Sequence, residues 1–226
     1  MRANVHISEK FNCIYVQTQK VACTTILKTM QIQEAGGETP HLTASPHKRE
    51  FSLLAQIPLF ALTSRDPLLE GSYFRFSFVR NPYTRVVSAF LDRLGSKQPL
   101  RNRYIKKLGL PENSELPFLD FLKILNESDP RRMNKHWMPL TLLTQIDRVN
   151  YDFIGRVENF SHDFDHVLRT IYKKNYDDKR YRRAHHATGA SAKVLDLIGS
   201  NEKQLIEKIY EQDFENFNYR TTLDAI

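Results

Sequence analysis

Residues 73–90 read YFRFSFVRNPYTRVVSAF and join a strand-like run directly to a helix-like one. Aromatic residues alternate with smaller or polar ones over Tyr73–Val79, which predicts a strand. Asn81 is a favoured N-cap and Pro82 a favoured first helical residue, so we expect a helix to begin there. A strand that passes straight into a helix is typical of α/β folds.

The predicted helix has two different faces. Its apolar face carries Val86, Val87, Phe90, Leu91 and Leu94. Its polar face carries Arg85, Ser88 and Asp92.

The same alternation of strands and helices continues on both sides of this segment. Further strands are expected at Cys13–Val16 and Tyr151–Gly155, and further helices at Ile26–Met30, at Ser161–Tyr172 and from Asn201, where Asn201 and Gln204 resemble a capping box. Residues 36–50 and 95–115 carry the Gly, Pro, Asn and charge typical of loops or insertions. The sequence therefore predicts one α/β domain over residues 1–226, with a mainly parallel central sheet flanked by helices.

The composition excludes several classes of protein. Hydrophobic residues make up 41% of the 226 residues, too many for a disordered chain. No apolar run reaches the roughly eighteen residues of a membrane span, and the N-terminus lacks a secretory signal. We expect a cytoplasmic protein, although a chain trimmed of an anchor would read the same. Cys13 and Cys23 are too few for a disulfide framework or a structural zinc site.

The net charge of +7 indicates an anionic partner, and nucleic acid, an anionic cofactor or an anionic glycan would each suit it. Between the first predicted strand and its helix lies a loop made of Lys20, Val21, Ala22, Cys23, Thr24 and Thr25. Backbone N–H groups at a helix N-terminus favour an anion, the lysine adds a full charge, and the two threonines add hydroxyl donors. Neither a Walker A pattern nor G-x-G-x-x-G is present.

A second anion site is predicted at the end of the strand expected at Tyr73–Val79. Arg80 offers forked donors that match a phosphate, and Ser88 follows on the polar face of the next helix. Two such sites in one α/β chain indicate a ligand with phosphates at both ends.

With these motifs the chain resembles the sulfotransferase superfamily, and within it the carbohydrate branch that includes chondroitin and HNK-1 sulfotransferases. Lys20–Thr25 is similar to the family's 5′-phosphosulfate loop, and Phe78–Phe90 is similar to its 3′-phosphate segment. Downstream matches are His136–Pro139, Tyr151–Glu158, the closing helix Ile209–Tyr219 and, more weakly, the loop His185–Thr188.

The resemblance also shows departures from the family. Gln17-Thr18-Gln19 replaces the usual proline-containing approach to the lysine. Thr144 and Gln145 stand near where Golgi relatives carry cysteines, which suits a reducing compartment and argues against a Golgi enzyme. We expect a soluble, bacterial-type member of the family.

The resemblance implies a P-loop-like core that binds 3′-phosphoadenosine 5′-phosphosulfate as co-substrate, without a metal. It assigns Lys20 to the oxygen that bridges to the departing 5′-phosphate. It assigns the 5′-phosphate to Val21, Ala22, Cys23, Thr24 and Thr25, the 3′-phosphate to Arg80 and Ser88, and a cofactor-closing role to Thr188. The expected acceptor is a hydroxyl of a carbohydrate, while tyrosine and small alcohols stay open.

The acceptor hydroxyl needs a general base, and histidine is the natural choice near neutral pH. We predict His136, because it lies in the downstream match beside Trp137, whose ring would stack on a sugar. The alternatives for the base are His41, His47, His186 and Glu158.

Three other functions stay open from the sequence. A nucleotide kinase with an atypical phosphate loop would fit the first motif, and a basic nucleic-acid-binding protein would fit the charge. A sulfotransferase-like fold retained only for binding would fit both motifs. Under the preferred sulfotransferase interpretation we expect no nucleic-acid partner and no membrane span. The sequence does not indicate the oligomeric state.

Overall fold

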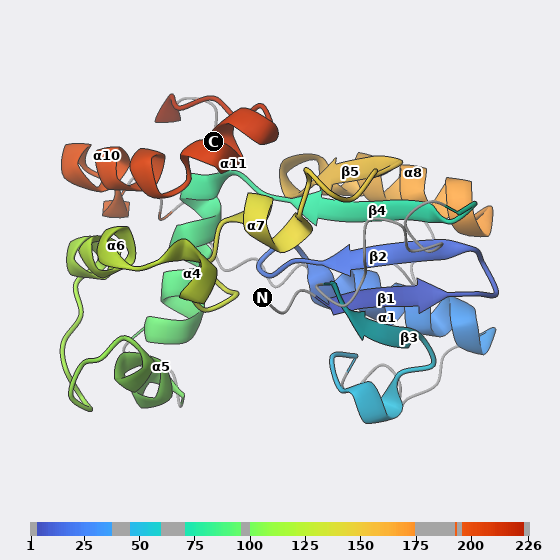
Figure 1. Ribbon diagram of the computed structural model, residues 1–226, viewed down its shortest axis with the longest axis horizontal. Coiled ribbons are helices and arrows are strands. Elements are labelled where there is room, and N and C mark those ends of the chain that lie inside the picture. Colours follow the sequence, from blue (N-terminus) through green and yellow to red (C-terminus); the bar gives the residue numbers. More distant parts are fainter. Residues whose placement is uncertain are drawn as a thin grey trace. The chain divides into compact units, whose positions relative to one another are not determined.

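A computed structural model of the chain describes residues 4–37, 46–59, 71–95, 100–174, 193 and 196–223. The chain divides into two compact units (Figure 1). The sheet unit is Met1–Val79 with Leu142–His185, and the helical unit is Arg80–Thr141 with His186–Ile226. The short helix α7 (Leu140–Thr144) spans the point where the chain returns to the sheet unit.

The sheet unit is built on five strands in the order β3-β1-β2-β4-β5. Their bounds are β1 (Asn4–Ser8), β2 (Cys13–Gln17), β3 (Ala55–Pro58), β4 (Phe74–Val79) and β5 (Phe153–Arg156). The pairs β2–β4 and β4–β5 are parallel, whereas β1 pairs antiparallel with both β2 and β3. The α/β class is confirmed, and the sheet is mixed instead of mainly parallel. The reason is that residues 9–12 form a short turn between β1 and β2, which leaves no room for the crossover that parallel strands need.

One face of the sheet is covered by α1 (Cys23–Ala35) and α8 (Phe160–Tyr172), which lie behind the strands in Figure 1. The Phe78 ring of β4 lies 5.3 Å from the ring of Phe160 and 6.1 Å from that of Phe164. Gly155 of β5 is the register partner of Phe78, and a Cβ there would come closer than 3.0 Å to the Phe78 ring. Glycine is therefore needed where the aromatic layer meets β5.

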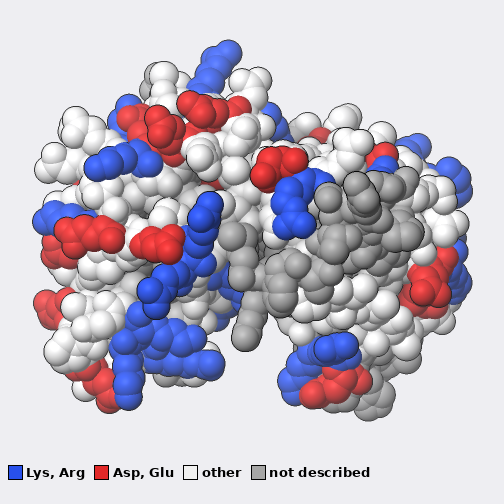
Figure 2. Space-filling model, viewed as in Figure 1, with Lys and Arg blue, Asp and Glu red and all other residues white. Residues whose placement is uncertain are grey.

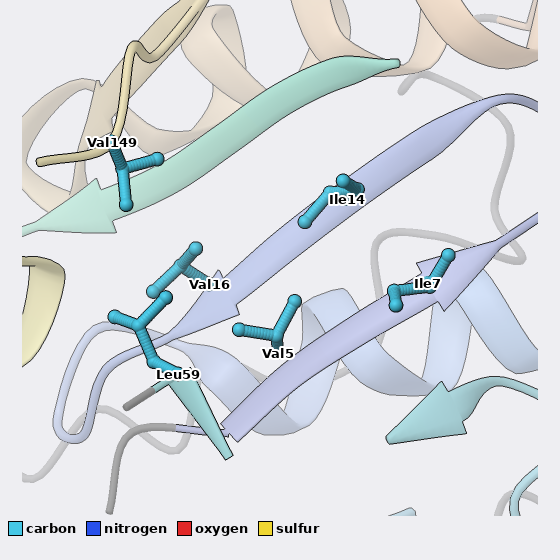
Figure 3. Packing of buried hydrophobic residues seen from close by; sticks show 6 residues of the cluster. All are labelled: Val5, Ile7, Ile14, Val16, Leu59 and Val149. Carbon is cyan, nitrogen blue, oxygen red and sulfur yellow. The ribbon is translucent and has the colours of Figure 1, made fainter. Parts of the chain in front are cut away.

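The other face carries a smaller aliphatic cluster (Figure 3). Its buried members are Val5, Ile7, Ile14, Val16, Leu59 and Val149. Since successive side chains of a strand point to opposite faces, Ile14 and Val16 enter this cluster while Tyr15 joins the aromatic side. Burial on both faces explains why β2 reads as a continuous apolar run.

The helical unit packs around α4, which begins two residues after Arg80. Its helices are α4 (Pro82–Leu94), α5 (Arg101–Lys107), α6 (Phe118–Glu127), α10 (Ser200–Ile209) and α11 (Glu211–Asn216), with a 3-10 turn η3 (Pro130–Arg132). The Phe90 ring of α4 lies 5.0 Å from Phe118 and 5.4 Å from Phe121 of α6. The Tyr83 ring lies 5.1 Å from Phe214 of α11.

Three local expectations need correction. The polar face of α4 is buried as well, because Arg85 and Ser88 are each only 1% exposed. The expected loop at residues 95–115 contains the helix α5. The last predicted helix begins at Ser200, and the carboxylate of Glu202 accepts a hydrogen bond from the backbone N–H of Gly199, so the capping pair is shifted from Asn201 and Gln204.

Candidate functional site

The lysine loop (Lys20–Thr25) follows β2 and has an unusual backbone. Lys20 and Ala22 both lie in the left-handed region, with φ of 68° and 61°. A left-handed residue costs about 1 kcal/mol or more without glycine's freedom, so two in one short loop mark a functional constraint. Alternating left- and right-handed residues aim successive N–H groups into a concave nest that binds anions. The fully buried Val21 side chain anchors this loop to the core.

The helix that the lysine loop opens has an N-terminus suited to an anion. At the N-cap of α1, Ala22, there is no side-chain cap hydrogen bond, and the first turn of this described helix contains no acidic residue. The helix α4 differs, because the Asn81 side chain accepts a hydrogen bond from Tyr83 N at 3.0 Å and so caps its own helix. The backbone donors of α1 therefore suit a bound phosphate group.

Side chains join the end of β2 and the residues just before the lysine loop to the neighbouring strand β4. Thr18 Oγ1 donates to the carbonyl oxygen of Phe78 at 2.7 Å, and Ser77 Oγ donates to the carbonyl oxygen of Val16 at 2.8 Å. Both hydroxyl-bearing residues are fully buried. Because β2 and β4 are parallel, these bonds hold their carboxyl ends at the same edge of the sheet, the edge where α/β proteins bind ligands.

A chain of hydrogen bonds reaches the lysine loop from β1. His6 Nε2 lies 2.9 Å from Gln17 Oε1, Gln17 Nε2 lies 3.1 Å from His47 Nδ1, and His47 Nε2 lies 3.0 Å from Thr24 Oγ1. His6 and Gln17 are buried, whereas His47 and Thr24 are exposed. From the sequence, His47 was predicted only as an alternative general base. Nothing in the residues around His47 indicated that its side chain contacts Thr24.

The second predicted segment, Arg80 with Ser88, belongs to the helical unit. Arg80 Nε donates to Thr84 Oγ1 at 3.0 Å, and Thr84 Oγ1 donates to the carbonyl oxygen of Asn81 at 3.1 Å. The guanidinium is thus held by the first turn of α4, in a partly buried position. Ser88 lies further along the same helix and is buried.

His136 lies in the helical unit with one ring nitrogen fixed. Its Nδ1 is 2.6 Å from Asn134 Oδ1, which also accepts from the His136 backbone N–H at 3.1 Å. An amide oxygen can only accept, so in the neutral ring the proton is on Nδ1 and Nε2 carries the lone pair. The neighbouring Trp137 is 1% exposed and packs edge-on against Tyr104 and Phe121. The expectation that the Trp137 ring stacks on a sugar is therefore wrong.

A buried charged cluster holds the downstream block of the helical unit together. Asp213 accepts hydrogen bonds from the backbone N–H groups of Leu140 and Thr141, both at 2.7 Å. Burial lowers the pKa of Arg85, and the negative charge of Asp213 partly offsets that shift. Tyr210 donates to the carbonyl oxygen of Trp137 at 2.7 Å. The closing helices thus serve to position residues 136–141.

A pocket of about 510 Å³ opens in the helical unit beside this block. Lys107, Arg132, Asn134 and Trp137 are among its lining residues. Figure 2 shows Lys and Arg side chains gathered over α5 and over the segment that follows α6. The pocket therefore combines cationic side chains with the residue that orients His136.

The predicted site residues are divided between the two units. Lys20–Thr25 belong to the sheet unit, and Arg80, Ser88 and His136 belong to the helical unit. Thr188, His41 and His186 lie outside the described residues. Glu158, the remaining alternative base, is exposed in the 3-10 turn η4 (Val157–Asn159).

Both cysteines are free thiols. Burial raises the pKa of Cys13 to about 12, which suppresses its thiolate. Across the described ranges there is no group of three or more His, Cys, Asp or Glu residues that could hold a metal ion. Among the helices that the structure describes, none combines the length and apolar character needed to cross a membrane.

Comparison with known proteins gives one consistent family. A model of the Sulfotransferase family matches residues 3–220. The chain is 26% identical over 229 residues to carbohydrate sulfotransferase 14 of Homo sapiens, which covers 96% of the chain and 60% of that protein. It is 24% identical over 233 residues to carbohydrate sulfotransferase 11 of Rattus norvegicus, which covers 94% of the chain and 66% of that protein.

A third relative is carbohydrate sulfotransferase 9 of Homo sapiens, 23% identical over 238 residues, with 97% of the chain and 54% of that protein covered. The chain therefore spans less than two thirds of the length of these curated relatives. No solved structure matches the chain.

Proposed function

Because the chain belongs to the sulfotransferase family, we propose that it transfers a sulfuryl group from 3′-phosphoadenosine 5′-phosphosulfate to a hydroxyl of a carbohydrate. The observation that carries this proposal is the lysine loop. It joins left-handed backbone at Lys20 and Ala22 to a helix N-terminus without a side-chain cap among the described residues. This arrangement fits a phosphate group, the part of the co-substrate that departs in the reaction.

Lys20 and the loop amides act on the leaving group. The co-substrate supplies the sulfuryl group, which moves in line from the phosphate oxygen to the acceptor oxygen. Negative charge grows on the bridging oxygen as that bond breaks, and the ammonium group of Lys20 stabilises this charge more in the transition state than in the ground state. The amides of Val21, Ala22 and Cys23, with the hydroxyls of Thr24 and Thr25, hold the 5′-phosphate.

Arg80 and Ser88 hold the 3′-phosphate in this proposal. The bond from Arg80 Nε to Thr84 supports it, because it restrains the guanidinium before any ligand binds. A restrained fork loses less conformational entropy when it pairs with a phosphate. Thr188 stays a prediction for closing over the cofactor.

His136 is the proposed general base. The bond between Nδ1 and Asn134 Oδ1 supports the role, because it leaves the lone pair on Nε2. The pocket lined by Lys107, Arg132 and Asn134 is the proposed acceptor site. The relatives' name, carbohydrate sulfotransferase, supports a sugar as the acceptor.

A direct assay tests the function. The protein is incubated with ³⁵S-labelled co-substrate and a panel of glycans, and label transfer and release of adenosine 3′,5′-bisphosphate are both measured. Lys20→Met is the matched inactive control, because it keeps the Cβ and an aliphatic stem at the left-handed position and removes the ammonium group. Bisphosphate binding without transfer to any hydroxyl would indicate a fold retained for binding. Failure to bind the bisphosphate at all, with magnesium-dependent turnover of ATP, would contradict the proposal.

A further inference from the structure

The hydrogen-bond chain that reaches the lysine loop from β1 has a direction. The Gln17 amide nitrogen can only donate and its oxygen can only accept. Gln17 Oε1 therefore accepts from the Nε2–H of His6, and Gln17 Nε2 donates to Nδ1 of His47. With Nδ1 of His47 used as an acceptor, its neutral ring carries the proton on Nε2.

That proton decides how Thr24 is oriented. Nε2 of His47 lies 3.0 Å from Thr24 Oγ1, so the ring donates and the hydroxyl oxygen accepts. A hydroxyl has one proton, which must then point away from the histidine. Thr24 is the second residue of α1, at the helix end where the backbone N–H groups face a bound anion.

We propose that Gln17 and His47 are positioning residues that orient the Thr24 hydroxyl as a donor to the 5′-phosphate. This inference rests on the proposed function, since the phosphate belongs to the proposed co-substrate. His6 and Gln17 are 1% and 3% exposed, so the direction of the chain is set in the buried part and transmitted outward. An oriented donor avoids the reorganisation that a freely rotating hydroxyl needs when the phosphate binds.

Calorimetry with adenosine 3′,5′-bisphosphate tests the role of the hydroxyl and of His47. Thr24→Val removes the donor and should weaken binding about tenfold or more, since the bond is to a charged group. His47→Ala should weaken it about three- to tenfold, as for the loss of one neutral hydrogen bond. His47→Gln keeps an N–H donor in reach of Thr24 and should recover most of the affinity.

A double-mutant cycle tests whether the residues act through Thr24. In the Thr24→Val background, His47→Ala and Gln17→Met should have no further effect on affinity, because the hydroxyl they orient is gone. Independent, multiplicative losses would contradict the proposal. Thermal melts of each variant separate loss of binding from loss of folding. Because His47 is exposed, we expect His47→Ala to lower the Tm least among these variants.

The tautomer gives a readout that a purely structural role would not move. Nitrogen-15 NMR of the histidine rings in the full chain should show His47 protonated on Nε2, and Gln17→Met should weaken that preference. A proton on Nδ1 in the wild type would overturn the inference. So would a His47→Ala variant with full bisphosphate affinity and no turnover, because His47 would then be the general base. If the wild type fails to bind the bisphosphate, the proposed function fails, whatever the tautomer.

Discussion

Thr18 Oγ1 donates a 2.7 Å hydrogen bond to the carbonyl oxygen of Phe78, and this bond joins the segment just before the lysine loop to the end of the neighbouring strand β4. Thr18 is 0% exposed, so its loss leaves a buried carbonyl without this donor. We expect Thr18→Val to reduce the free energy of unfolding by about 1–3 kcal/mol and to weaken bisphosphate binding. Denaturant unfolding and calorimetry measure the two effects. Thr18→Ser keeps the hydroxyl and should remain close to the wild type in both, and an equal loss in Thr18→Ser would show that the bond is not the cause.

Adenosine 3′,5′-bisphosphate should bind more tightly than AMP, because AMP lacks the 3′-phosphate proposed for Arg80 and Ser88. One hydrogen bond to a charged group contributes about 1.5–3 kcal/mol, so the preference should reach at least about tenfold. Arg80→Lys should remove much of this preference, since a point charge cannot reproduce the fork. Calorimetry with both nucleotides measures it. Equal affinities in the wild type would place the 3′-phosphate elsewhere.

Lys20→Ala should reduce single-turnover rates by roughly 100-fold or more and weaken bisphosphate binding far less. The reason is that the ammonium group acts on charge that develops only during transfer. Lysine and alanine both carry a Cβ at φ 68°, so Lys20→Ala keeps the backbone strain, and Lys20→Gly, which relieves it, is the necessary comparison. Both variants should be equally slow. A normal rate in Lys20→Gly would show that neither the ammonium group nor the strained backbone is needed for transfer.

His136→Ala should lower the rate by about 100- to 10,000-fold while the bisphosphate still binds normally. His136→Gln retains hydrogen-bonding capacity without basicity and should be nearly as slow. Asn134→Ala releases Nδ1 of the ring and should give an intermediate rate, since it removes the hydrogen bond that fixes the tautomer of His136. His41, His186 and Glu158 are substituted one at a time as the comparison. If one of these substitutions abolishes transfer while His136→Ala stays active, that residue is the general base.

Asp152 provides a prediction on stability and pH. Burial opposes ionisation of Asp152, but hydrogen bonds from the side chain and backbone of Arg75, at 2.8–3.2 Å, lower its pKa overall. A carboxyl whose pKa is lower in the folded state stabilises above its unfolded pKa of about 3.9 and loses that contribution as pH falls through the folded value. The Tm difference between wild type and Asp152→Asn should therefore be present at pH 7 and shrink below about pH 4. Exposed Asp147→Asn is the control, and a difference that is constant with pH would contradict the assignment.

Local patterns in the sequence were sufficient for the elements that carry the site. The strand before Arg80, the Asn81 cap with Pro82, and the helix after the lysine loop all form as predicted, because turn chemistry and periodicity act within a few residues. The same patterns led to the family, which the match over residues 3–220 confirms. That match also replaces the kinase interpretation, which the first phosphate motif had left open, and the nucleic-acid interpretation, which the net charge had left open.

What the sequence could not reveal depends on contacts between distant segments. The antiparallel pairing of β1 with β2 and β3 makes the sheet mixed, and no local pattern encodes which strand is the neighbour of another. Arg85 was predicted on a polar face, yet it is buried near Asp213, 128 positions along the chain by their numbers. Local amphipathicity describes one helix and cannot foresee a second charged partner that makes burial tolerable.

The sequence by itself determined that this chain belongs to the sulfotransferase family and predicted a phosphate site at Lys20–Thr25, because both depend on short contiguous motifs. Only the tertiary structure decided that Trp137 is a core residue and that the neutral ring of His136 has its proton on Nδ1. It also decided that a chain of hydrogen bonds runs from His6 through Gln17 and His47 to Thr24. The physical reason is that exposure, tautomer and hydrogen-bond direction are properties of a side chain's surroundings. Those surroundings are assembled from segments that come together only when the chain folds.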